Sequence, residues 1–156
     1  MMKGHDTHGN GNVYRNFAIE LAVDFAIMYF VMYTMIATLG HLYVNVNNVY
    51  MTLMMVAPMA VVMLVSMRSM FTLQKRNAAI ALVAIAVFVA SFVAMRRQSA
   101  VGDAQFLRSM IPHHSGAILM CEQASLTDQE IVALCRDIVA AQKAEIATMQ
   151  AMLARQ

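Results

Sequence analysis

Long apolar runs dominate the chain up to about residue 95. Three of them, residues 17–39, 49–73 and 78–95, approach or exceed the roughly 20 residues that an α-helix needs to cross a bilayer. Residues 1–16 are polar, and no small-residue cleavage site follows a short apolar core, so we expect no cleaved secretory signal. The pattern predicts a polar N-terminal tail and then a three-span transmembrane domain over residues 17–97.

A different pattern follows over residues 98–156, where apolar residues recur at helical spacing on both sides of a short turn at Leu126. We predict an antiparallel helical hairpin outside the membrane. A hairpin of about fifty residues buries too little surface to be stable alone. We therefore expect it to complete a four-helix bundle by homo-oligomerisation, or to pack on the membrane helices. The predicted fold class is an all-α membrane protein.

Polar residues mark the expected ends of the two hairpin helices. Asp103 is the expected N-cap of the first helix. Thr127 and Glu130 fit a capping box at the start of the second. Pro112 lies inside the first helix, where its missing backbone donor is expected to kink the helix or to begin a new segment.

Basic residues near the span ends predict the orientation of the protein. The first loop has no lysine or arginine, whereas the N-terminal tail and the second loop together contain Lys3, Arg15, Arg68, Lys75 and Arg76. Arg96 and Arg97, after the third span, act against this bias. The balance predicts a multi-pass protein of the bacterial inner membrane, with a cytoplasmic N-terminus and a periplasmic hairpin.

Composition narrows the classes of function. Hydrophobic residues make up 60% of the 156 residues and charged residues 13%, so membrane lipid is the expected surrounding. The formal net charge of +2 is too small to indicate nucleic-acid binding. The sequence has no nucleophile paired with a base, no phosphate-binding glycine loop and no Glu-x-x-His pair, so we do not expect an enzyme.

Sulfur and nitrogen donors gather on the first helix of the hairpin. At about 100° per residue, the following side chains fall within roughly a third of its circumference: Met110, His113, His114, Met120 and Cys121. Thioether, imidazole and thiol donors suit soft, late first-row metals, above all copper as Cu(I), and also silver. The pattern therefore makes this stripe a candidate metal site.

The second hairpin helix offers further donors. Gln142, Glu145 and Met149 are spaced by three and four residues and share one face. Folding the chain near Leu126 brings this face to the level of the histidines. Glu145 could then fix the tautomer of an imidazole, as carboxylates beside metal ligands do. His41, in the first loop, is a candidate to receive an incoming ion if that loop lies near the hairpin.

The residues alone leave alternatives open. Adjacent helical residues point about 100° apart, so at most one of the two histidines can be central. Structural histidines beside an apolar methionine stripe would give the same pattern. Cys121 could supply a thiolate, fill space, or form a disulfide with Cys135 outside the cytoplasm, because the sequence does not fix how the two cysteines face.

Two motifs carry a resemblance to a known family. Met110-Ile111-Pro112-His113-His114, followed by Gln142-x-x-Glu145-Ile146-x-x-Met149, resembles the domain-of-unknown-function family numbered 305 over roughly Asp103 to Leu153. The resemblance implies a ferritin-like helical bundle, associated in some members with binding of, or resistance to, copper and silver in bacterial envelopes. By position, the functional residues that it implies are Met110, His113, His114, Met120, Gln142, Glu145 and Met149.

The spans carry a second set of candidates. Met55, Met59, Met63 and Met67 recur every four residues, and such a stripe could pass soft ions or simply fill gaps between helices. Glu20 and Asp24 lie one turn apart on the first span, where carboxylates are costly unless they face a partner, a cavity or water.

We therefore expect a membrane-anchored protein that binds copper or silver for sequestration, delivery or tolerance, as a homo-oligomer and with a metal-handling partner protein. The alternatives are a structural or assembly subunit of a membrane complex, and a subunit of a metal-ion channel or transporter.

Overall fold

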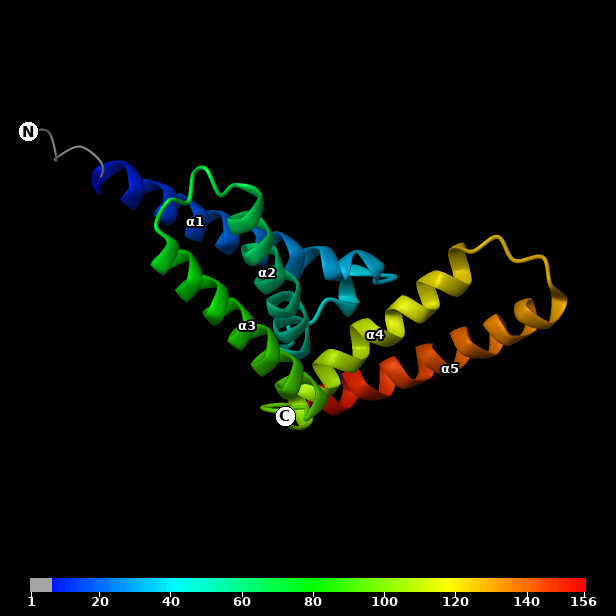
Figure 1. Ribbon diagram of the computed structural model, residues 1–156. Helices are drawn as coiled ribbons and strands as arrows, with labels where there is room; N and C mark the ends of the chain where they lie inside the picture. The colour runs from blue at the N-terminus through cyan, green and yellow to red at the C-terminus, as the bar shows by residue number, and fades with distance from the viewer. Residues whose placement is uncertain (1–6) are drawn as a thin grey trace, which may run out of the picture. The chain divides into compact units, whose positions relative to one another are not determined.

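The computed structural model describes residues 7–156, with side chains from residue 11 onward. This part of the chain is entirely helical, as predicted, and contains no strand (Figure 1). Its elements are α1 (Thr7–Val31), the 3-10 helices η1 (Met32–Met35) and η2 (Leu39–His41), α2 (Val46–Ser66), α3 (Gln74–Arg96), α4 (Asp103–Gln123) and α5 (Gln129–Leu153).

Three helical segments are long and apolar enough to cross a membrane: Gly11–Met35, Val46–Ser66 and Gln74–Arg96. The prediction of three candidate spans is thus confirmed, but their bounds differ. The first α-helix begins at Thr7 and ends at Val31, before the predicted end at residue 39. The last residues of that apolar run form η1 and the loop after it, which contact α4. Apolar composition alone does not distinguish such a packed loop from the end of a membrane helix.

The described chain divides into two compact units. One, called here the span unit, contains α1 up to Tyr29 together with Val49–Ser99. The other, called here the α4–α5 unit, contains Phe30–Asn48 and Ala100–Gln156. The first loop was predicted as part of the membrane domain, yet it clusters with the last two helices.

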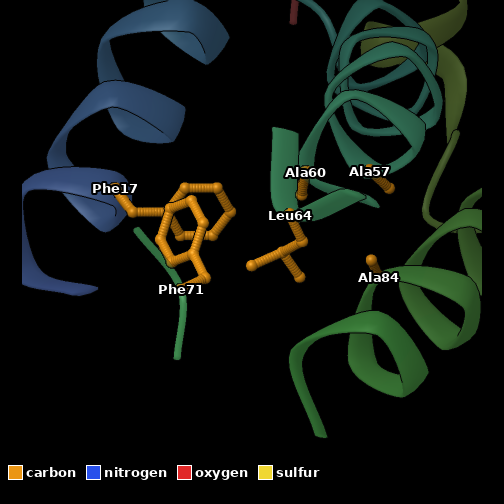
Figure 2. Packing of buried hydrophobic residues seen from close by; sticks show 6 residues of the cluster. All are labelled: Phe17, Ala57, Ala60, Leu64, Phe71 and Ala84. Atoms are coloured by element: carbon orange, nitrogen blue, oxygen red, sulfur yellow. The ribbon is translucent and has the colours of Figure 1, made fainter. Parts of the chain in front are cut away.

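A small core holds the span unit together. Figure 2 shows how its residues meet: aromatic rings from α1 and the α2–α3 turn lie against small and aliphatic side chains of α2 and α3. The rings of Phe17 and Phe71 pack edge to face, with centroids 5.1 Å apart. The alanines of this core allow close approach between helices. The core residues are Phe17, Ala57, Ala60, Leu64, Phe71 and Ala84.

Polar contacts join the start of α1 to the turn between α2 and α3. The Tyr14 hydroxyl donates to Oδ1 of Asn77 at 2.7 Å, and Nδ2 of Asn77 donates to the carbonyl oxygen of Phe71 at 2.7 Å. The guanidinium of Arg76 lies over the Tyr14 ring, 5.7 Å from its centroid. The N-terminal part of α1 and the second loop therefore lie at the same end of the span unit.

In the α4–α5 unit, α4 and α5 lie side by side and run in opposite directions (Figure 1). Their shared core contains Leu107, Ile111, Ile118, Ile146 and Met149. A disulfide between Cys121 and Cys135, whose Cα atoms are 5.3 Å apart, joins the helices near the turn.

Two predicted helix caps in this unit are wrong. The N-cap of α4 is Gly102, which offers no side chain, and Asp103 is already in the first turn. The N-cap of α5 is Asp128 instead of Thr127, since its carboxylate accepts from the backbone N–H groups of Glu130 and Ile131. Helix α4 continues through Pro112, so this residue does not begin a new segment.

Candidate functional site

The loop between the first two spans is fastened to the middle of α4 by a buried serine. Ser115 is fully buried, and its Oγ accepts a hydrogen bond of 2.7 Å from the backbone N–H of Ala37. The same Oγ lies 2.8 Å from Nδ1 of His41. Because the hydroxyl already accepts from Ala37, its own hydrogen is best placed to donate to His41, which leaves the ring hydrogen on Nε2. His41 thus serves as a structural contact of the loop in this geometry.

The residue after this serine lets the loop backbone approach closely. A Cβ on Gly116 would stand 3.5 Å from the carbonyl oxygen of Met35 and 3.9 Å from its Cβ. The loop has two further anchors: Oε1 of Gln105 accepts from the backbone N–H of Val46 at 3.1 Å, and Gln150 donates to the carbonyl of Gly40. Loop and helices therefore form one folded unit.

His114 is held at both ring nitrogens. It is buried, its Nδ1 lies 2.9 Å from the carbonyl oxygen of Met110, and its Nε2 lies 2.7 Å from Oε2 of Glu145. A carbonyl oxygen only accepts, so Nδ1 carries a hydrogen, and the Nε2 contact needs one more hydrogen, on the imidazole or on the carboxyl group. Either way, Nε2 has no free lone pair for a metal ion.

His113 has the opposite environment. It is exposed, it meets His114 only through an edge-to-face ring contact at 6.0 Å, and its nitrogens have no hydrogen-bond partner in the described chain. Met110 lies one turn before it and is half-buried at the edge of the core. Met120, with 56% exposure, follows two turns later on the same side of α4. The exposed face of α4 is defined here by Phe106, Met110, His113, Ala117 and Met120.

The remaining predicted donors do not belong to this exposed face. Met149 is buried in the core between α4 and α5, where it acts as an apolar side chain. Gln142 is half-buried on α5, and Glu145 is the partner of His114. The prediction that Cys121 supplies a thiolate is corrected, because its sulfur is bonded to Cys135. Among residues 11–156, no group of three His, Cys, Asp or Glu side chains could hold a metal ion.

The span unit contains an apolar cavity of about 180 Å³, lined by aliphatic residues of α1, α2 and α3 such as Leu21, Ala57 and Val87. The residues predicted for a membrane path lie elsewhere on the described helices. Met55 and Met67 are exposed, and Met63 packs against the core. None of the candidates lines this cavity: Glu20, Asp24, Met55, Met59, Met63 and Met67.

The residues that fasten the loop to α4 were not predicted. Ser115 and Gly116 directly follow the two histidines, but neither residue type signals a distant partner. Only His41 carried a hint, as a polar residue in a loop that was expected on the same side of the membrane as the hairpin.

Comparison with known proteins adds one family and one relative. The model of the Domain of unknown function (DUF305) family matches residues 67–153. The match begins well before the expected start at Asp103 and includes α3. An uncharacterized protein of Acanthamoeba polyphaga mimivirus is 34% identical over 118 residues, which cover 74% of this chain and 76% of the relative. No solved structure matches the chain. On the length of the family match and this identity, the chain belongs to the DUF305 family.

Proposed function

We propose that this protein binds a soft monovalent cation, Cu(I) or Ag(I), on the exposed face of α4, outside the membrane, for sequestration, delivery or tolerance. The observation that carries the proposal is that the two adjacent histidines differ in the hydrogen bonding of their ring nitrogens. His114 has both nitrogens engaged, whereas the exposed His113 keeps a nitrogen free to coordinate.

The Met110 thioether is the natural second ligand. Residues three apart on a helix have Cβ atoms about 5–6 Å apart, so the Met110 sulfur and the His113 ring can reach one ion. A thioether and a neutral imidazole carry no charge, which suits a soft cation better than a hard divalent ion that prefers carboxylates. Glu145 supports the site indirectly, because its contact fixes His114 beside it.

Two donors from one helix leave coordination positions open, and a second copy of the chain is the proposed source of the rest. Large apolar side chains remain exposed on both helices of the α4–α5 unit, among them Phe106, Ile131 and Leu134. Burying them between two copies would give a four-helix bundle. Such a bundle would bring two exposed faces of α4 near each other.

The proposed orientation has the N-terminus in the cytoplasm and the α4–α5 unit on the outer side of the cell membrane. The first loop and residues 100–156 belong to one compact unit, which fits a common side. Arg15, Arg68 and Arg76 belong to the opposite end of three spans, which fits the inner side. An impermeant maleimide should therefore label Leu39→Cys in intact cells and Ser69→Cys only after lysis. The reverse labelling pattern would contradict this orientation.

Cu(I) titration of the full chain in detergent micelles, against a chromogenic Cu(I) chelator and without oxygen, tests the binding proposal. The double variant Met110→Leu, His113→Ala should lose at least about tenfold in affinity, equivalent to 1.4 kcal/mol. Met152→Leu is the matched control, since Met152 is an exposed methionine on α5. Equal affinity for the wild type and the double variant would overturn the proposal.

A further inference from the structure

We propose that Met35, the last residue of η1, and Met120, on α4, form a second soft-cation site of two thioethers over Gly116. The inference extends the function proposed above to a second ion on the same face of α4. Met35 lies outside residues 67–153, the part of the chain that matches the family model, so the family match does not cover this pair.

The position of Met35 follows from the loop contacts. Its Cβ lies 3.9 Å from the place that a Cβ on Gly116 would occupy. The hydrogen bond from the Ala37 N–H to Oγ of Ser115, and the one from the Ser115 hydroxyl to Nδ1 of His41, hold the loop in this place. Met35 is nevertheless 48% exposed, so its side chain is not enclosed by the contact with Gly116.

Met120 lies one turn after Gly116 and is 56% exposed. Cβ positions four residues apart on a helix are about 5–6 Å apart, so the Cβ atoms of Met35 and Met120 are separated by at most roughly 10 Å. A methionine sulfur extends two bonds beyond its Cβ. Two such side chains, with metal–sulfur bonds of about 2.3 Å like those of zinc, can span that separation through one ion.

Helix geometry places the Met120 side chain near Met35 and away from His113. Side chains on an α-helix lean toward the N-terminus and cover the preceding turn. Met120 therefore leans back over Gly116, where Met35 lies, whereas His113 leans toward Met110. Seven residues separate His113 from Met120, a rise of about 10.5 Å, so the two sites follow one another along the helix.

The chemistry of the pair favours the same class of ion. Thioethers bind Cu(I) and Ag(I) without losing a proton, and they are poor ligands for hard cations. Neither sulfur belongs to the core of the unit, so ligation requires no rearrangement of buried residues. With two thioethers and no imidazole, the site is expected to bind more weakly than the first and to exchange its ion readily.

Silver titration followed by NMR of methyl-labelled methionines in the full chain tests this inference, since Ag(I) is diamagnetic. The methyl signals of Met35 and Met120 should shift together with one midpoint, and Met120→Leu should weaken the response of Met35 by about tenfold. Gly116→Val, which adds bulk beneath Met35, should also weaken it while both sulfurs remain. The control Met152→Leu should leave both shifts unchanged.

This experiment tests the two proposed sites independently. In the variant Met110→Leu, His113→Ala the first site is removed, and the Met35 and Met120 signals should still shift. A Met35 signal that stays in place at saturating silver, or that shifts equally in Met120→Leu, would overturn the second site. Absence of any shift of the Met110 methyl signal would instead overturn the first site alone.

Discussion

Nε2 of His114 lies 2.7 Å from Oε2 of Glu145. This side chain of α5 therefore occupies one nitrogen of a buried imidazole on α4, and the carbonyl oxygen of Met110 occupies the other. The contact joins the two helices in the middle of their shared length. It also separates the roles of two adjacent histidines, because His113 on the neighbouring face has no such partner in the described chain.

The two histidines should therefore respond differently to removal. His114→Ala deletes a buried ring with two hydrogen bonds and should lower the free energy of unfolding by about 2–3 kcal/mol. His113→Ala alters an exposed side chain and should change that free energy by no more than about 0.5 kcal/mol. Denaturant unfolding of both variants in the same detergent measures the difference, and equal losses would contradict the assignment.

The buried serine makes a second prediction, on the loop. Ser115→Ala leaves the half-buried Ala37 N–H and His41 ring without their shared partner, and the loss in free energy of unfolding should be about 1 kcal/mol, the lower end of the range for unpaired groups. The amide of Ala37 should exchange its hydrogen faster, because the loop detaches more often from α4. Ser109→Ala is the matched control, since that hydroxyl donates within α4 to the carbonyl of Gln105. Unchanged exchange at Ala37 in the Ser115 variant would show that the loop is held by other contacts.

The sequence predicts the elements of this fold well because hydrophobic periodicity is local. Three long apolar runs predicted the three helical segments that are long and apolar enough to cross a membrane, and helical spacing after residue 98 predicted α4 and α5. The possible pairing of Glu145 with an imidazole also followed from helix geometry, although spacing could not decide between His113 and His114. That choice depends on how each helix is rotated about its axis, which only tertiary packing determines.

Long-range contacts explain what the sequence did not predict. Ser115 meets Ala37 across 78 positions of the chain, and a serine inside a helix carries no signal of such a partner. The apolar residues of the loop fit a membrane span as well as a packed segment, so the predicted first span, residues 17–39, extends beyond the helical segment that ends at Met35. The pairing of Cys121 with Cys135 depended likewise on helix rotation.

The disulfide should contribute measurably to the stability of the α4–α5 unit. Closing a loop of about 15 residues removes conformational freedom from the unfolded chain and is worth about 3 kcal/mol, and the two cysteines are 14 residues apart. Reduction should therefore lower the unfolding midpoint of the wild type. The variant Cys121→Ser, Cys135→Ser should have the lower unfolding midpoint without reductant, and adding reductant should not change it. A wild type that is equally stable with and without reductant would contradict this contribution.

The start of α5 offers a test of a single hydrogen-bonding side chain. Asp128 accepts from the N–H groups of Glu130 at 2.8 Å and of Ile131 at 3.2 Å, and its charge lies at the positive end of the helix dipole. Asp128→Ala should therefore lower the free energy of unfolding by about 1 kcal/mol. Thr127→Ala, one residue earlier, should change it by less than about 0.5 kcal/mol, because the cap bonds go to Asp128. Thermal unfolding of the two variants distinguishes the residues, and a larger loss for Thr127→Ala would place the cap where the sequence pattern first put it.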